Sequence, residues 1–93
     1  MTLKIERISD NRGDRIRLSG TLRSDGICQV KAEINLGRPV ALDLEDVDLV
    51  DVEAVRFLNA HEAEGMSVLH CSPYIREWMF REQELEKART DWR

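Results

Sequence analysis

The chain has 93 residues, of which 42% are hydrophobic and 34% are charged, and its net charge at pH 7 is −4. This length allows one small hydrophobic core, so we expect a single domain over residues 1–93 without a deep multi-substrate cleft. No apolar run approaches the length of a membrane span, and the alternating N-terminus lacks the continuous apolar core of a signal peptide. We therefore expect a cytoplasmic protein with no membrane insertion.

The charge is unevenly distributed along the chain. Residues 1–38 carry eight Lys or Arg and five Asp or Glu, residues 43–64 carry one Arg and eight acids, and residues 65–93 carry five of each. The central segment therefore has a charge of 1 − 8 = −7, which disfavours nucleic acid and favours a basic protein surface. We expect a protein partner and no nucleic acid.

The first predicted element is a β-hairpin. Polar and apolar residues alternate over residues 3–8, turn-forming residues occupy 10–14, and the alternation resumes with Arg15 and Arg17 facing outward. Ser19-Gly20 is expected to end the second strand. The pattern predicts an antiparallel pair with one solvated face.

A helix is predicted to follow the hairpin. Ser24 is a suitable N-cap and Gly37 a suitable C-terminal stop, although Asp25-Gly26 is also turn sequence and would start the helix a residue or two later. Between them, four residues recur at helical spacing: Ile27, Val30, Lys31 and Ile34.

The centre of the chain joins a strand to a second helix. Residues 40–44 are almost wholly apolar and predict a strand buried on both faces. The helix begins at Asp51 and Gly65 ends it, and its buried side is predicted to carry Ala54, Val55, Leu58 and His61. The acids Glu45, Asp46 and Asp48 are expected to form a turn at the carboxyl end of the strand, where α/β folds usually bind their ligands.

A short strand and a long helix complete the predicted structure. Residues 66–70 predict the strand, and Ser72 followed by Pro73 predicts the start of the helix. Its inward side is expected to carry Ile75, Trp78, Met79, Glu82 and Leu85. From about residue 81 the helix becomes a charged tail in which Trp92 is expected to fold back or contact another chain.

These elements predict an α/β fold in the order β-β-α-β-α-β-α. Right-handed crossovers give a mixed, mostly parallel four-stranded sheet with an N-terminal antiparallel hairpin and three helices, which cover mainly one face.

One ordered set of residues carries a resemblance to a known family. Ala41-Leu42-Asp43-Leu44-Glu45-Asp46-Val47, then Asp51, then Gly65 resembles the STAS domain of anti-sigma-factor antagonists, and the flanking elements fit the same pattern. The resemblance implies a STAS-like fold and a non-catalytic module that binds an anti-sigma-factor kinase in bacterial signalling and transcription regulation. Relatives occur in sulfate transporters, lipid-transport complexes and stressosomes.

The chain departs from this family at the phosphorylated position. In the antagonists, the Asp is followed by Ser, by a phosphorylated Ser or Thr, and by Gly, whereas this chain has Asp51-Val52-Glu53-Ala54. Glu53 is therefore the phosphosite equivalent. Glutamate brings one charge in place of the phosphoryl group's roughly −1.5 to −2, so it imitates that group in part. Since no Ser or Thr lies between Ser24 and Ser67, we expect no phosphorylation switch there.

The resemblance and the acidic pattern together predict a partner-binding site. Its candidate residues are Asp46, Asp48, Asp51, Val52, Glu53 and Phe57. Two interpretations stay open. Glu53 and Phe57 form the centre of a docking surface, or Phe57 completes the core and Glu53 only complements the helix dipole.

Other chemistry is weakly indicated. The six carboxylates between Asp43 and Glu53 lack the spacing and the glycine of a calcium loop, and the adjacent His70 and Cys71 would point to opposite faces without an orienting acid. Cys28 and Cys71 are expected to be free buried thiols. We therefore expect neither an enzyme nor a cofactor or metal.

Two alternatives to the docking module remain. One is a carrier of a small hydrophobic ligand, with Tyr74, Trp78 and Phe80 near an apolar pocket under the last helix. The other is a subunit of a transport or regulatory assembly, a homodimer for example, that self-associates through Trp92 and the charged tail.

Overall fold

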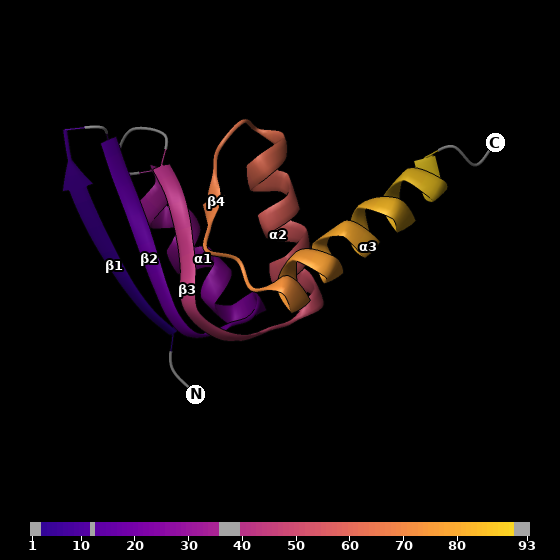
Figure 1. Cartoon of the computed structure of the whole chain (residues 1–93), viewed down its shortest axis with the longest axis horizontal. Coiled ribbons are helices and arrows are strands. Elements are labelled where there is room, and N and C mark those ends of the chain that lie inside the picture. The colour runs from indigo at the N-terminus through magenta and orange to yellow at the C-terminus, as the bar shows by residue number, and fades with distance from the viewer. Residues whose placement is uncertain (1–2, 12, 36–39, 91–93) are drawn as a thin grey trace.

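The computed structural model describes residues 3–11, 13–35 and 40–90, and Figure 1 shows the order of its elements. The strands are β1 (Leu3–Asp10), β2 (Gly13–Leu22), β3 (Val40–Val50) and β4 (Val68–Leu69). The helices are α1 (Ser24–Asn35), α2 (Val52–Ala63) and α3 (Pro73–Thr90). The predicted order β-β-α-β-α-β-α and the α/β class are confirmed.

The four strands form one mixed sheet in the order β1-β2-β3-β4. β1 and β2 are antiparallel, whereas β2 with β3 and β3 with β4 are parallel, as predicted. β4 is shorter than the predicted strand over residues 66–70 and pairs only with Leu42 and Asp43. Among the described residues, β3 beyond Leu44 therefore has a neighbouring strand only on its β2 side.

β3 extends far beyond the predicted strand, so the acidic turn expected at Glu45, Asp46 and Asp48 does not form. Its pairing with β2 shifts twice, and each shift places one extra residue in β3, which is a β-bulge. Because of the bulges, the buried residues Leu44, Val47 and Val50 recur at intervals of three. A regular strand has a period of two, so this spacing concealed the strand in the sequence.

The junction between β2 and α1 also differs from the prediction. β2 continues past Gly20 to the fully buried Leu22, and α1 begins at Ser24, so Asp25-Gly26 is helical rather than a turn. A Cβ atom at Gly26 would lie 2.8 Å from Leu3 Cδ2, and the glycine therefore allows α1 to lie close to β1. The predicted stop at Gly37 lies outside the described residues.

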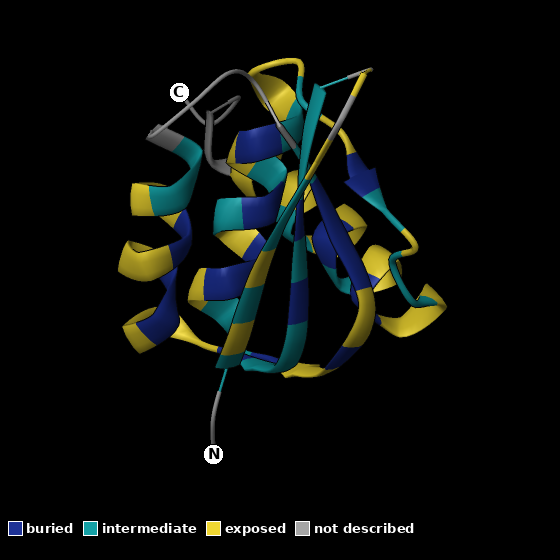
Figure 2. Ribbon diagram, turned by 90° about the vertical axis from the view of Figure 1, so that its left-hand side faces the viewer, coloured by how far each residue is buried: buried dark blue, intermediate teal, exposed yellow. Residues whose placement is uncertain are grey.

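The hydrophobic core lies between the helices and one face of the sheet, as Figure 2 shows by burial. On β2, Ile16 and Leu18 are fully buried under the helices, whereas Arg15 and Arg17 project from the opposite face and are partly exposed. The prediction that helices cover mainly one face is confirmed. The buried apolar residues are Ile16, Leu18, Leu22, Ile27, Val30, Leu42, Leu44, Val47, Val50, Ala54, Val55, Leu58, Val68, Ile75 and Met79.

The buried apolar residues of α3 lie in its first half, whereas its polar contacts with α2 reach as far as Gln83. Its N-terminus is capped as predicted, since the Ile75 N–H donates to Ser72 Oγ at 3.4 Å and Pro73 is the first helical residue. Ile75 and Met79 are buried, but Leu85 is 54% exposed, so its predicted inward position is wrong. The helix leaves the body of the molecule, as Figure 1 shows, and the side chains of residues 83–87 are all exposed. Trp92 lies outside the described residues.

Polar side chains connect α2 to α3. Asn59 Nδ2 donates to the Met79 carbonyl at 2.9 Å, and Asn59 Oδ1 accepts from Gln83 Nε2 at 2.8 Å. Arg76 forms two hydrogen bonds with the Glu62 carboxylate at 2.9 and 3.0 Å. These contacts fix the angle at which α3 departs from the domain.

No helix in the described part of the chain is long and apolar enough to cross a bilayer.

Both cysteines are free, as expected, but Cys28 is exposed and only Cys71 is partly buried. Cys28 lies outside the Ile27, Val30 and Ile34 stripe of α1, which explains why its predicted burial is wrong.

Candidate partner-binding site

Asp51 connects the beginnings of two helices. It is the N-cap of α2, and its Oδ1 accepts the Ala54 backbone N–H at 2.9 Å. Its Oδ2 accepts the Ser24 N–H, at the start of α1, also at 2.9 Å. The Asp51 N–H donates to the Leu22 carbonyl at 3.3 Å, so side chain and backbone together hold the two helix starts at one end of the sheet.

These hydrogen bonds keep Asp51 ionised. Burial disfavours the charged carboxylate and acts to raise its pKa, but the N–H groups of Ala54 and Ser24 outweigh that effect. The pKa of Asp51 consequently lies below its ordinary value. Because both carboxylate oxygens accept bonds within the chain, Asp51 has a structural role at this site.

Glu53 lies in the first turn of α2 and its side chain is 56% exposed. Its Oε1 is 3.3 Å from Arg56 Nη1, and Arg56 Nε also donates to Glu82 Oε1 at 3.1 Å. The hydrogen bond that Arg56 donates to Glu82 is the largest influence that raises the pKa of Arg56. Glu53 thus shares one arginine with a second carboxylate, and this group of three keeps a net negative charge.

Phe57 lies one helical turn after Glu53 and is half-buried. Its ring centroid is 6.2 Å from that of the buried His61 and 5.9 Å from Lys31 Nζ, a cation–π geometry that reaches across to α1. A surface hollow of about 360 Å³ lies beside it, lined by Lys31, Ile34, Phe57, Ala60, His61, Glu64 and Met66. The burial of His61 agrees with its prediction as a core residue.

The remaining predicted site residues lie on β3. Asp46 Oδ2 is 2.7 Å from Arg17 Nη2, and Arg17 projects from the open face of the sheet, across from α2. Asp48 is exposed on the stretch of β3 that leads into Asp51. The structure therefore brings Asp51, Val52, Glu53 and Phe57 together at the start of α2, but it does not bring Asp46 to them.

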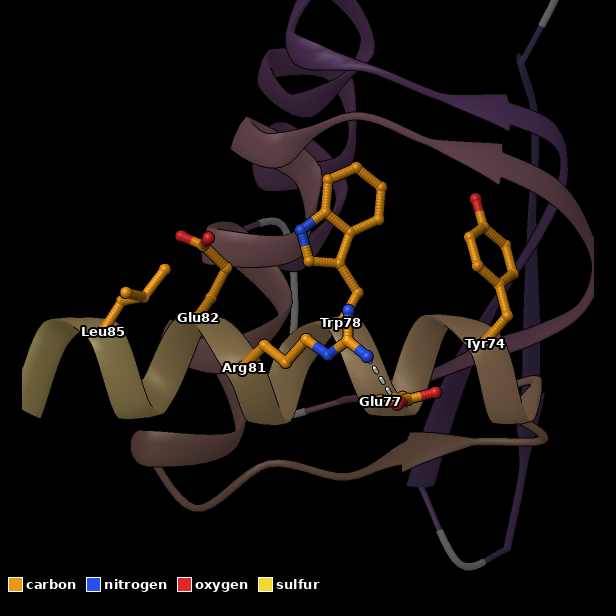
Figure 3. Close-up of a pocket in the computed structure, with 6 residues that line it drawn as sticks. All are labelled: Tyr74, Glu77, Trp78, Arg81, Glu82 and Leu85. Carbon is orange, nitrogen blue, oxygen red and sulfur yellow. Dashed lines mark hydrogen bonds and ion pairs between the residues drawn. The ribbon is translucent and has the colours of Figure 1, made fainter.

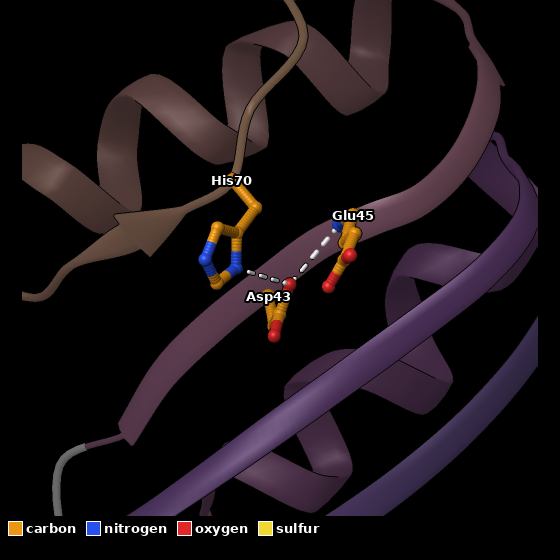
Figure 4. A group of neighbouring side chains, drawn as sticks. All are labelled: Asp43, Glu45 and His70. Carbon is orange, nitrogen blue, oxygen red and sulfur yellow. Dashed lines mark hydrogen bonds and ion pairs between the residues drawn. The ribbon is translucent and has the colours of Figure 1, made fainter.

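A second polar cluster lies between β3 and β4, shown in Figure 4. Asp43 is only 3% exposed, and its Oδ1 accepts the Glu45 N–H at 3.0 Å and lies 3.1 Å from His70 Nδ1. Its Oδ2 is 3.9 Å from Arg15 Nε. Burial acts to raise the Asp43 pKa, but the Glu45 N–H and His70 outweigh it and the pKa lies below the ordinary value. Asp43 is the acid that orients His70, which the sequence pattern did not reveal.

The cluster contains the donor atoms of a metal site but is also complete without one. Asp43, Glu45 and His70 each offer one ligand atom within 4.8 Å of the others. The hydrogen bonds and the nearby Arg15 already satisfy the Asp43 carboxylate, so the cluster is accounted for as a polar link between β3 and β4. The spacing of Asp43 and Glu45 on one side of a strand was visible in the sequence, but the pairing with His70 depends on strand register.

Cys71 does not complete a nucleophilic pair with His70. Its Sγ lies 4.0 Å from Met79 Sδ, on the core side, whereas His70 contacts Asp43 on β3. Burial raises the pKa of the Cys71 thiol, which disfavours the reactive thiolate. The described residues around Cys71 thus provide no activated nucleophile.

Comparison with known proteins gives matches among solved structures. Neither the models of protein families nor the curated protein sequences match this chain. Among solved structures, the unphosphorylated form of the anti-sigma factor antagonist SpoIIAA matches with a TM-score of 0.61 and 18% sequence identity, over 95% of this chain and 98% of that one. At this identity the likeness establishes the fold. The chain has the STAS-like fold of an anti-sigma factor antagonist, as its sequence predicted.

Proposed function

We propose that this protein is a non-catalytic interaction module that binds a regulatory protein of the anti-sigma type through the first half of α2. The observation that carries the proposal is the position of Glu53. It is an exposed carboxylate in a helix turn fixed by Asp51, at the place where the resemblance puts the phosphorylated residue of the antagonists. The likeness to SpoIIAA, an anti-sigma factor antagonist, supports the same class of function.

The second support is the pairing of charge with an apolar surface. Val52, Glu53 and Phe57, together with the hollow beside Phe57, form what we call the docking face. A partner that places a basic side chain against Glu53 can insert an apolar side chain into the hollow between α1 and α2. Such a combination of a central aromatic residue and a flanking charge is typical of binding hot spots.

Glu53 makes the docking face independent of phosphorylation. Residues 25–66 contain no Ser or Thr, so a kinase has no hydroxyl group to modify in β3 or α2. The partner therefore always meets a carboxylate there. We infer a constitutive form of the interaction, set by the level of the protein and not by its phosphorylation state.

The test compares four tagged baits in native lysate of the source organism, followed by calorimetry with the purified partner. The baits are the wild type, Glu53→Lys, Glu53→Ser and Glu84→Lys. Glu84 is exposed on α3, away from the docking face, so Glu84→Lys is a control with the same change of charge. Circular dichroism checks that each bait is folded.

We expect one regulatory protein to be retained by the wild type and by Glu84→Lys, and to bind Glu53→Lys at least about tenfold more weakly. Glu53→Ser should bind with intermediate strength, because it removes the charge without reversing it. If all four baits retain the same proteins with the same affinity, Glu53 does not contribute to recognition and the proposal is wrong.

A further inference from the structure

One side of α3 carries four residues at a regular spacing. Tyr74, Trp78, Arg81 and Leu85 are separated by four, three and four positions, and we call them the α3 seam. Figure 3 shows Tyr74, Trp78 and Leu85 projecting from the same side of the helix, with the Arg81 side chain lying along the helix toward Glu77. A hollow of about 360 Å³ runs along this side.

The α3 seam is open to solvent for most of its length. Tyr74 is 46% and Leu85 54% exposed, and only Trp78 packs partly against the core. The centroids of the Tyr74 and Trp78 rings are 6.4 Å apart, so the two rings form one continuous apolar surface. Because α3 projects from the body, a second helix can approach the seam from outside (Figure 1).

The spacing of the seam is that of a coiled coil. Intervals of four, three and four residues are those of successive d, a, d and a positions in a heptad repeat, which face a partner helix. The same intervals place the four residues on one face of the helix, where they can meet a partner together. In the described domain, α2 contacts this part of α3 through Gln83, which is not a seam residue, and Leu85 in the seam stays 54% exposed.

The seam is complementary to itself when two copies run antiparallel. Around a two-fold axis midway between Met79 and Phe80, Tyr74 faces Leu85 of the second copy and Trp78 faces Arg81 of the second copy. The first pair is apolar, and the second places a guanidinium against an indole ring, the most favourable cation–π combination. Glu77, at 2.9 Å from Arg81 Nη2, holds the guanidinium at the seam.

We propose that the α3 seam binds the same seam of a second copy of this chain, as an antiparallel pair of helices related by a two-fold axis. A two-fold interface uses the same surface twice, and this seam fits that requirement. The contact spans about two heptads and is small, so the dimer is weak, with a dissociation constant on the order of 10 to 100 µM. It leaves the docking face on α2 available.

The first experiment measures the mass of the full chain by sedimentation equilibrium, from about 10 µM to about 500 µM. The variants are Leu85→Glu in the seam and Phe80→Glu as a control, because Phe80 is 60% exposed on another side of α3. Both substitutions exchange an exposed apolar residue for the same acid. We expect Leu85→Glu to weaken the dimer at least about tenfold, and Phe80→Glu to leave it within about twofold of the wild type.

The second experiment tests the orientation by disulfide formation. In a Cys28→Ser background, chains carrying Tyr74→Cys are mixed with isotope-labelled chains carrying Leu85→Cys and are oxidised gently. An antiparallel pair gives mainly the mixed 74–85 product, whereas a parallel pair gives 74–74 and 85–85 products. The proposal is overturned by a monomer at all concentrations, by a dimer that Phe80→Glu weakens as much as Leu85→Glu, or by products that are mainly 74–74 and 85–85.

Discussion

At the scale of single residues, Asp51 is the side chain on which the docking face depends. It accepts hydrogen bonds from Ala54 and Ser24, which lie in different helices. Asp51→Ala leaves both N–H groups without this acceptor, and we expect the free energy of unfolding to fall by about 2 kcal/mol. Urea denaturation at pH 7 measures the change. Asp48→Ala, an exposed residue of β3, should change it by no more than about 0.5 kcal/mol.

The lowered pKa of Asp51 also makes the stability of the folded protein depend on pH. The pKa of Asp51 is lower in the folded protein than its ordinary value of about 3.9, so its ionisation stabilises the folded state above that pH. This contribution is lost as the pH falls below the pKa of Asp51 in the unfolded chain and through its lower pKa in the folded protein. Asp51→Asn keeps a capping oxygen but does not titrate. Its stability should therefore fall less steeply than that of the wild type between about pH 5 and about pH 3. Equal slopes would contradict the role assigned to the carboxylate.

At the scale of elements, Asn59 holds α3 against α2. Asn59→Asp keeps the shape and the acceptor for Gln83 but removes the donor to the Met79 carbonyl, which then faces a carboxylate. We expect a loss of about 1 to 2 kcal/mol in stability and faster hydrogen exchange of the amides in residues 77–87. Gln29→Glu on the exposed side of α1 makes the same amide-to-acid change and should leave the exchange of α3 unaltered.

The sequence predicted those parts of the fold that depend on local signals within one element. The N-terminal signals at Ser72-Pro73 and the stop at Gly65 are local, and both are found in the structure. The length of β3 was missed because two bulges convert its period from two to three, and a bulge depends on the neighbouring strand. Leu85 was placed inward by its spacing alone, which does not tell whether a helix extends past the body it packs on.

At the scale of the whole molecule, the shape argues against a buried ligand. Among the described residues, the hollows along α3 and between α1 and α2 are each about 360 Å³, a hollow between α2 and α3 is about 620 Å³, and all three lie at the surface. Figure 3 shows the first of them. A carrier of a hydrophobic molecule encloses most of its ligand. We therefore expect native mass spectrometry of the purified protein to give the masses of one or two chains alone. A co-purifying small molecule would favour the carrier alternative instead.

The sequence predicted the part of the candidate site that lies within one helix start. Asp51, Val52, Glu53 and Phe57 are neighbours along one helix start, so a pattern in sequence was enough to group them. Contacts between distant segments were not accessible in this way. Lys31 beside Phe57 and Glu82 beside Arg56 join residues of different elements, and only the packing of the helices determines them.

The two hydrogen bonds that Asp51 accepts, from Ser24 in α1 and Ala54 in α2, also affect how the chain folds during synthesis. The hairpin and α1 leave the ribosome first, but the carboxylate that caps Ser24 follows 27 residues later. At about 5 to 20 residues per second, the start of α1 waits roughly one to five seconds for its acceptor. The nascent chain therefore gains its full helix capping only once the β3–α2 junction has emerged, and a pause in translation just before Asp51 would prolong the interval in which the Ser24 N–H lacks this acceptor.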